Sequence, residues 1–243
     1  MENRIPLGNR IAKVLSRAGI ASRRNAEHMI KEGRISVNGI RVINPVFNIS
    51  ENDNISVDGR PIRRPEPQRL WIYYKPIGLV TTEKDEKERP TVFGNLPNNL
   101  PRVMSVGRLD INSEGLLLLT NDGEIKRKLE LPSNGWLRKY RVRIKGRPTD
   151  KEFDCMRSGL LLNNQQLRPI KVKIDRQLGT NAWLSVGLRE GKNREIRKAL
   201  ESIGYKVNRL IRVSFGPFQL KQLKPGELQE VRTHIFKDQL YRM

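Results

Sequence analysis

Histidine and cysteine are nearly absent from this 243-residue chain, which contains two histidines and one cysteine. A single cysteine allows neither a disulfide framework nor a cysteine zinc site. His28 and His234 lie near opposite ends of the sequence, so a histidine general base in the central part of the chain and a Ser-His-Asp triad are not expected. Cys155 has no histidine near it in sequence, which argues against thiolate catalysis.

Long apolar runs are missing as well. No segment approaches the roughly 18 apolar residues of a membrane-spanning helix, and the N-terminal residues MENRIPLGNR contain no signal-peptide stretch. The chain also lacks the phosphate loop G-x-x-x-x-G-K-[ST] and the dinucleotide motif G-x-G-x-x-G. These absences predict a cytoplasmic protein. If it is an enzyme, they leave carboxylate, arginine and tyrosine chemistry with no metal and no cofactor.

Acidic residues are few relative to basic ones. The chain has 47 lysines and arginines against 26 aspartates and glutamates, which gives a formal net charge of +21. An excess of this size favours a polyanionic partner, either nucleic acid or an anionic membrane surface. Because no membrane segment is present, we expect nucleic acid and no membrane; a domain with surplus surface lysine is the alternative.

The first sixty residues have the pattern of a small separate module. Apolar spacing, a Ser22 cap and an Asn-Gly turn predict two helices, a hairpin and a further strand. These elements are expected over residues 10–18, 22–31, 35–42 and 55–57. Three prolines within residues 61–67 then indicate a linker to a second domain.

Seven cations lie on or beside the two expected helices, opposed by few acids. They are Arg10, Lys13, Arg17, Arg23, Arg24, Lys31 and Arg34. Cations spaced in this way can follow a phosphate backbone, although any one of them could belong to a solvated helix face. The segment RIAKVLSRAGIASRRNAEHMIKEGRISVNG resembles the alpha-L RNA-binding domain, which occurs in a small-subunit ribosomal protein and in several RNA-modifying enzymes. The resemblance implies an RNA-binding domain over residues 8–66.

In the larger remaining part, strand patterns outnumber helix patterns and do not alternate regularly with them. Strands are expected over residues 70–75, 103–108, 116–120, 140–145, 169–174, 183–188 and 207–215. Helices are expected over residues 124–131 and 194–202, and from the capping box of Thr149 and Glu152 to Gly159. We therefore expect an α+β fold, with a mainly antiparallel mixed sheet flanked by helices.

The segment GRLDINSEGLLLLTNDGE, residues 107–124, is the most informative part of the chain. Its four consecutive leucines lie between turn signals and predict a short strand that is buried on both faces. The preceding loop would hold Asp110 on a rigid support at the edge of a cleft. Asp110 is therefore a candidate functional residue.

The start of this segment, GRLD followed by S-x-G-L-L-L-L-T-N-D-G, resembles the signature of the ribosomal pseudouridine synthases of the RsuA/RluB family. Three more blocks match in order: YYKPIG at 73–78, KYRV at 139–142 and EGKNREIR at 190–197. The resemblance implies a pseudouridine synthase catalytic domain over residues 69–233. Such an enzyme flips specific uridines of ribosomal RNA out of their stack and isomerises them to pseudouridine. It implies ribosomal RNA or a ribosomal subunit assembly intermediate as partner, and residues 124–140 are closer to the large-subunit (23S) enzymes.

The resemblance also implies roles for single residues. Asp110 matches the nucleophile, which attacks the ribose or the base, and Tyr140 matches the tyrosine that stacks on the flipped uracil and can take the C5 proton. Arg197 matches the basic residue that pairs with the aspartate and favours its charged form. Arg108 is expected to fill the space that the flipped base leaves. Contacts to the RNA backbone are expected from Arg189, Lys192, Asn193 and Arg194.

Other interpretations of these residues stay open at this point. Asp110 could cap a turn, Tyr140 could be a core residue, and Arg197 could be a surface helix cation. A non-catalytic ribosome-assembly factor would keep the basic helices without needing these three residues. The same reaction on small-subunit (16S) rRNA is a further alternative, and a metal-dependent hydrolase would need an acidic cluster that the sequence does not provide. We expect a monomer, because no long apolar stripe is left unassigned.

Overall fold

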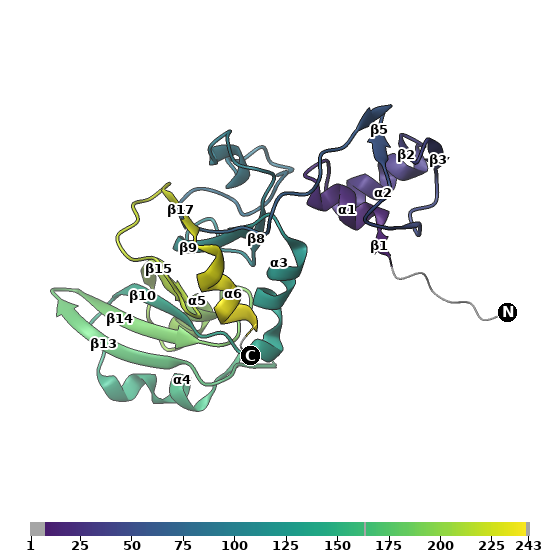
Figure 1. Ribbon diagram of the computed structural model, residues 1–243. Coiled ribbons are helices and arrows are strands. Elements are labelled where there is room, and N and C mark those ends of the chain that lie inside the picture. Colours follow the sequence, from purple (N-terminus) through teal and green to yellow (C-terminus); the bar gives the residue numbers. More distant parts are fainter. Residues whose placement is uncertain (1–7, 163, 242–243) are drawn as a thin grey trace. The chain divides into compact units, whose positions relative to one another are not determined.

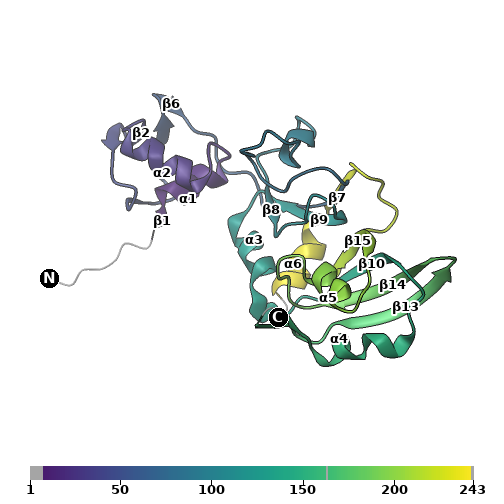
Figure 2. The same ribbon diagram turned by 180° about the vertical axis from the view of Figure 1, so that it is seen from behind.

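The structure is a computed structural model, and it describes residues 8–162 and 164–241. The chain divides into two compact units, one formed mainly by the residues up to Gln68 and the other by most of the residues from Arg69 onward. Figures 1 and 2 show the elements of each unit from opposite sides. No helix within the described ranges is long and apolar enough to cross a membrane.

The N-terminal unit packs two helices against a small sheet. Its helices are α1 (Ile11–Arg17) and α2 (Arg23–Lys31). Its sheet has the order β3-β2-β5-β6, formed by Ile40–Val42, Ile35–Val37, Ile55–Val57 and Arg60–Pro61, and β1 (Asn9–Arg10) pairs separately with β4 (Asn48–Ile49). The Ser22 side chain accepts a hydrogen bond from the N–H of Asn25 and caps α2, as predicted. Ile11, Leu15 and Ile30 are fully buried between the elements.

The second unit is built on a nine-stranded sheet. Its main path is β13-β14-β10-β15-β9-β7-β17, with β8 added to β9 and β16 added to β15. In chain order the strands are β7 (Leu70–Lys75), β8 (Met104–Val106), β9 (Glu114–Thr120), β10 (Arg138–Lys145), β13 (Lys171–Leu178), β14 (Asn181–Leu188), β15 (Val207–Phe215), β16 (Phe218–Gln219) and β17 (Leu228–Val231). Among the described strands of this sheet, only β9 and β15 run parallel to each other.

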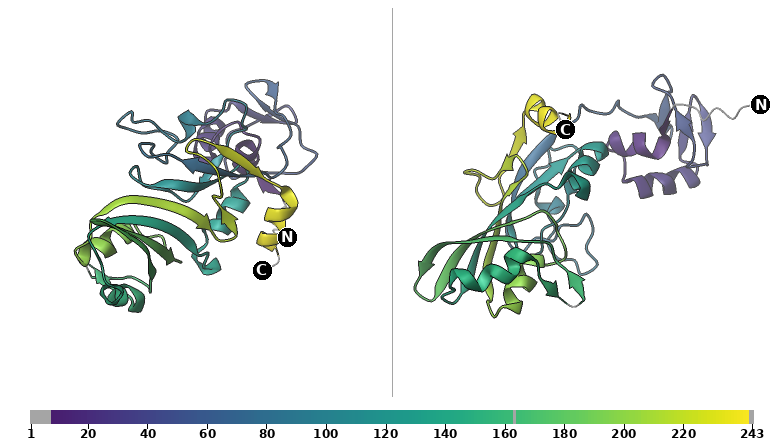
Figure 3. Two further views of the ribbon diagram at one scale, coloured as in Figure 1. Left: turned by 90° about the vertical axis from the view of Figure 1, so that its left-hand side faces the viewer. Right: turned by 90° about the horizontal axis from the view of Figure 1, so that it is seen from below.

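Helices cover the sheet at two places. Helices α3 (Gly123–Glu130) and α6 (Thr233–Tyr241) pack in one hydrophobic cluster with residues of β7 and β9. At the other end of the sheet, α4 (Asp154–Ser158) and α5 (Glu195–Ser202) lie on the same side of the curved strands (Figure 3). The short elements are η1 (Phe93–Asn95), η2 (Pro132–Asn134), η3 (Asp150–Phe153), β11 (Leu161–Leu162) and β12 (Gln165–Gln166).

The α+β fold class with a mainly antiparallel sheet is confirmed, and every strand and helix predicted in this unit is present. Strands β7 and β15 have the predicted bounds, and the other elements have shifted ends. The expected strand at 103–108 ends early, because Gly107 has a φ of +66°. The predicted capping box of Thr149 and Glu152 forms, but it opens a 3₁₀ turn before α4. Strand β17 and helix α6 were not predicted, since their apolar residues are too few for a clear periodicity.

The burial of the leucine strand is confirmed. All seven residues of β9 are buried, from Glu114 to Thr120, because β7 and β15 flank it and both of its faces are covered. The charged residue at its start, Glu114, has specific partners. Tyr74 Oη donates to Glu114 (3.0 Å), and the Arg209 guanidinium bonds both carboxylate oxygens of Glu114 (2.7 and 3.1 Å). The strand is therefore a rigid support for the loop before it.

Candidate active site

The loop that carries Asp110 connects β8 to β9 and faces a cavity of about 460 Å³. Asp110 is half-buried at this cavity. The other walls come from β10, from β15 and from the segment before α5. The lining includes Gly107, Arg108, Asp110, Ser113, Arg138, Tyr140, Lys192, Asn193, Arg194, Glu195, Leu210, Arg212 and Phe215.

A buried lysine at the end of β7 bonds the backbone of the Asp110 loop. Lys75 is fully buried, and its Nζ donates to the backbone carbonyls of Pro76 (3.0 Å), Asp110 (3.2 Å) and Ser113 (2.9 Å). Burial lowers the pKa of Lys75 to about 8, while the carboxylates of Asp110 and Glu114 act in the opposite direction. One ammonium group thus fixes both ends of the four-residue loop 110–113.

The two carbonyls in the middle of the loop are held by other elements. The N–H of Gly78 donates to the carbonyl of Ile111 (2.9 Å), and Arg197 Nη2 donates to the carbonyl of Asn112 (2.8 Å). Four successive carbonyls therefore each accept a hydrogen bond from outside the loop. The backbone that carries Asp110 has little freedom to move, which is the arrangement required of a group that must react in one geometry.

Arg197 anchors this loop from helix α5. Its side chain is buried at 7% exposure, and its Nη1 donates to the carbonyl of Val207 at the start of β15 (3.1 Å). Burial lowers the pKa of the guanidinium, and the Asp110 carboxylate opposes this effect by favouring the charged form. The structure therefore brings the positive charge of Arg197 close to the Asp110 loop, while its hydrogen bonds to the loop and to β15 are made with backbone carbonyls.

Tyr140 faces the cavity from β10, where it is 8% exposed. Side chains alternate along this strand, so Tyr140, Val142 and Ile144 point inward while Arg141 and Arg143 point to the opposite face. A register shift between β10 and β15 places Tyr140 opposite Arg212. These two side chains therefore share the inner face of the sheet and line the same cavity.

Two arginines of the cavity wall were not identified from the sequence. Arg138 stacks its guanidinium 4.6 Å from the centre of the Phe215 ring and donates from Nη1 to the carbonyls of Arg189 (2.9 Å) and Glu190 (3.2 Å). Arg212 is 3% exposed, and its Nε donates to the carbonyl of Leu116 (2.7 Å). Arg138 lies in a strand rich in lysine and arginine, where single cations are hard to distinguish. The inward orientation of Arg212 follows from its burial and from the register shift between β10 and β15.

Several buried polar atoms of the cavity wall have no hydrogen-bond partner among the described residues. They are Ser113 Oγ, Glu195 Oε1 and Arg212 Nη2. Glu195 accepts a hydrogen bond from the N–H of Lys192 with its other oxygen (2.9 Å), and burial raises the pKa of its carboxyl. A buried polar atom without a partner is costly, and three such atoms belong to residues of this one cavity wall.

The expected RNA-contacting residues are only partly at the cavity. Arg108, Lys192, Asn193 and Arg194 line it, and Arg108, Asn193 and Arg194 are exposed. Lys192 Nζ is held by an ion pair to Glu190 (3.0 Å) and a hydrogen bond to the carbonyl of Gln166 (2.5 Å). The fifth residue, Arg189, is not among the lining residues, and its guanidinium bonds the carbonyl of Gly135.

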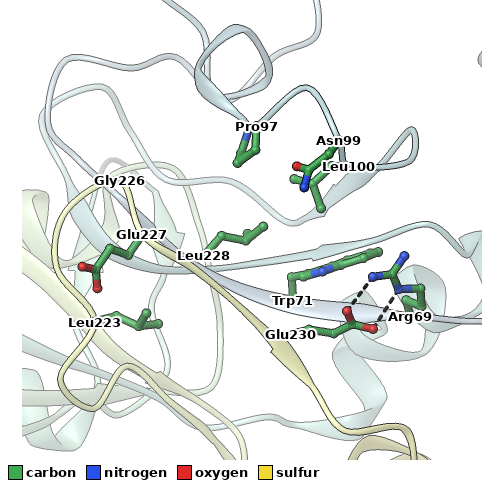
Figure 4. A pocket seen from close by; sticks show the side chains of 10 residues that line it. All are labelled: Arg69, Trp71, Pro97, Asn99, Leu100, Leu223, Gly226, Glu227, Leu228 and Glu230. Atoms are coloured by element: carbon green, nitrogen blue, oxygen red, sulfur yellow. Dashed lines mark hydrogen bonds and ion pairs between the residues drawn. The ribbon is translucent and has the colours of Figure 1, made fainter.

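A second cavity, of about 560 Å³, lies between β7, β17 and the loop that contains Pro97 and Asn99 (Figure 4). Two of its charged residues satisfy each other, since Arg69 forms a bidentate ion pair with Glu230 (2.6 and 2.8 Å) and lies over the Trp71 ring. The third, Glu227, accepts a hydrogen bond from the N–H of Lys224 (2.8 Å). None of the expected site residues lines it. The cavity at Asp110 is therefore the candidate active site.

In the N-terminal unit, six of the seven expected RNA-binding cations are exposed. They are Arg10, Arg17, Arg23, Arg24, Lys31 and Arg34, and Lys13 is half-buried. Arg34 forms a bidentate ion pair with Asp58 (2.6 and 2.9 Å), so part of its charge is neutralised. The arginines of α2 have the exposed guanidinium surface that phosphate contacts need.

Comparison with known proteins extends these observations. The sequence profile of the RNA pseudouridylate synthase family matches residues 69–202, and that of the S4 domain matches residues 9–55. An uncharacterized RNA pseudouridine synthase of Rickettsia felis is 47% identical over 94% of this chain and 99% of its own length. The ribosomal large subunit pseudouridine synthase B of Pseudomonas aeruginosa is 41% identical over 93% of this chain and 60% of its own length.

The crystal structure of a pseudouridylate synthase superposes on this chain with a TM-score of 0.66. The match covers 94% of this chain and 98% of the other, and at 24% identity it supports the fold alone. The extent of the profile match and the identity to relatives of nearly equal length settle the classification. The chain belongs to the RNA pseudouridylate synthase family and carries an S4 domain at its N-terminus.

Proposed function

We propose that this protein isomerises specific uridines of large-subunit ribosomal RNA to pseudouridine, with Asp110 as the nucleophile. The observation that carries the proposal is the meeting of Asp110 and Tyr140 in one cavity, from segments separated by a strand and a helix. The names of the relatives that share 41% and 39% identity with this chain support the large subunit as target. The partner would be rRNA or a subunit assembly intermediate, and the protein would act as a cytoplasmic monomer.

The reaction needs no net reagent, because the product is an isomer of the substrate. Asp110 attacks C1′ of the ribose or the uracil ring, and the N1–C1′ bond breaks. The uracil then turns until C5 bonds to C1′, and the bond that Asp110 had formed breaks, which returns the free carboxylate. C5 then loses its proton and N1 gains one. Tyr140 is suited to both parts of this sequence, because its ring can support the flipped base and its hydroxyl can reach the C5 proton.

Other residues would prepare the site for this chemistry. The hydrogen bonds from Lys75, Gly78 and Arg197 hold the Asp110 backbone in place before the RNA arrives. Arg108 would occupy the stack position that the flipped base leaves, which offsets part of a cost of a few kcal/mol.

Tritium release from rRNA that carries 5-³H-uridine tests the proposal. The native protein and Asp110→Asn are compared without added metal, on large- and small-subunit rRNA in separate reactions. We expect release from large-subunit rRNA by the native protein only. Release by both proteins would refute Asp110 as nucleophile, and release from small-subunit rRNA alone would refute the target.

Tight binding without release on either RNA would favour the alternative of a ribosome-assembly factor, which needs no reaction at Asp110. Among the described residues, no three acidic, histidine or cysteine side chains come together in a way that could hold a metal ion, so the hydrolase alternative has no candidate centre here.

A further inference from the structure

The outer face of the sheet, opposite the candidate active site, carries a concentrated positive charge. On β10, Lys139, Arg141 and Arg143 alternate with the inward residues and are exposed. On β13, Lys171, Lys173 and Arg176 are also exposed. We call these six cations the basic sheet face.

Strand pairing arranges the basic sheet face in rows across β14. In one row, Ser185 of β14 lies between Lys173 and Arg141, and in the next, Trp183 lies between Arg176 and Arg143. Cations on one strand face repeat about every 6.6 Å, and β13 and β10 are about 10 Å apart. Like charges this close repel each other, and the one acidic residue of β13, Asp175, accepts a hydrogen bond from Ser185 Oγ (2.7 Å).

An aromatic ring lies at the centre of this face. Trp183 is half-buried, and the guanidinium groups of Arg141 and Arg143 lie 4.8 and 6.0 Å from its ring centre. Stacking on the ring orders both arginines while their charge stays at the surface. The strand residues on this face are exposed, so no helix of the described residues covers it, and α4 and α5 lie on one side of the same strands (Figure 3).

We infer that the basic sheet face is a second RNA-binding surface, which contacts the phosphate backbone of the substrate RNA outside the active-site cavity. Ordered cations with little acidic compensation on an uncovered sheet match a polyanion. An acidic protein segment is the competing partner, and RNA is favoured because the chain belongs to an RNA-modifying family. The identity of the RNA as ribosomal rests on the proposed function.

The position of the face predicts which RNAs reach it. Because Tyr140 and Arg141 are neighbours on β10 and point to opposite faces, one RNA segment cannot fill the cavity and touch the basic sheet face at once. The substrate must pass around an edge of the sheet, and β13 is an edge strand of the main path. Only RNA that extends well beyond the target uridine can contact both surfaces.

Binding of a short and a long rRNA fragment by matched variants tests the inference. The test variant carries Arg141→Gln, Arg143→Gln and Lys173→Gln. The control carries Lys151→Gln, Lys224→Gln and Lys237→Gln, which removes the same charge from exposed positions elsewhere in this unit. Circular dichroism and thermal unfolding check that both variants are folded, and Kd is measured over a range of salt concentrations.

The test variant is expected to bind the long RNA about ten-fold or more weakly than the control, with a salt slope lower by about two to three. Binding of the short RNA is expected to be equal in both variants. The double variant Arg141→Lys, Arg143→Lys keeps the charge and is expected to retain most of the affinity.

Equal Kd and salt slope of the test and control variants on the long RNA would overturn the inference, and would leave an acidic protein as the partner to be sought. If the test variant lost affinity equally for the short and the long RNA, the inference would also be overturned. Such a result would show that the lower net charge of the protein weakens RNA binding in general. Tritium release by the native protein is followed separately. Weaker long-RNA binding without any release would support the surface while contradicting the proposed reaction.

Discussion

Replacing Arg197 tests whether the hydrogen bonds to the Asp110 loop are needed for catalysis. In the native protein its guanidinium bonds the carbonyls of Asn112 (2.8 Å) and Val207 (3.1 Å), and it is 7% exposed. The guanidinium reaches the two carbonyls from separate nitrogens, Nη1 and Nη2, whereas lysine carries all its N–H groups on one nitrogen. Arg197→Lys is therefore expected to keep the positive charge and lose one of the two bonds. Arg197→Ala loses the charge and both bonds.

The size of the effect follows from these contacts. A hydrogen bond from a charged donor contributes about 1.5–3 kcal/mol, and a buried acceptor without a partner adds a further cost. We expect Arg197→Ala to lower the free energy of unfolding by about 3–5 kcal/mol and Arg197→Lys by about 2 kcal/mol. A shift of the Asp110 loop by an ångström costs up to about 100-fold in rate, so the single-turnover rate is expected to fall about ten-fold in Arg197→Lys and about 100-fold in Arg197→Ala.

Three measurements separate positioning from other roles of this arginine. They are single-turnover tritium release, Kd for the RNA and denaturant unfolding, with Lys198→Ala as an exposed control on the same helix. Because Arg197 is buried behind the loop, Kd is expected to change less than two-fold in either variant. A native single-turnover rate in folded Arg197→Ala would refute the reasoning, and a loss of affinity as large as the loss of rate would show that Arg197 binds RNA.

Three further predictions concern single residues of the same unit. Tyr140→Phe keeps the ring but not the hydroxyl, so single-turnover tritium release is expected to fall about 100-fold with native Kd; a native rate would exclude the hydroxyl as the proton acceptor. The folded state lowers the pKa of Lys75 from 10.5 to about 8, so the unfolded state binds more protons between these values and stability rises with pH. Urea unfolding is expected to show a rise of about 3 kcal/mol over this window in the native protein relative to Lys75→Met, and parallel pH curves would contradict it. Gly115→Ala places a Cβ against the carbonyl of Arg212 at a φ of +104°, and we expect a loss of about 2–4 kcal/mol in unfolding free energy; a loss below about 0.5 kcal/mol would show that the strands can separate there.

A local pattern made the position of Asp110 predictable, because the run of leucines after it indicates a buried strand. Tyr140 was identified from the resemblance of residues 139–142, and the alternation along β10 agrees with its inward orientation. The hydrogen bonds of Lys75 and Arg197 could not be predicted in the same way. These bonds join segments far apart in the chain. The apolar and polar pattern of a strand does not show whether a lysine at its end is buried.

The inward orientation of Arg212 illustrates a second limit. The sequence of β15 is compatible with Arg212 on either the inner or the outer face of the sheet. The face on which Arg212 lies depends on the register shifts between β10 and β15. Such a shift depends on pairing between distant segments and not on local sequence. Arg138 was missed for a related reason, since its partners are backbone carbonyls at Arg189 and Glu190 on another segment.

The parallel pairing of β9 with β15 has a consequence for the order in which the protein forms during synthesis. The strand that follows Asp110 gains this neighbour, and its loop gains Arg197, only after the chain as far as Arg212 has left the ribosome. The S4 domain, whose contacts are mostly within its first sixty residues, is complete long before that. A growing chain therefore has its RNA-binding domain before it has an active site, and it can hold RNA before it is able to modify it.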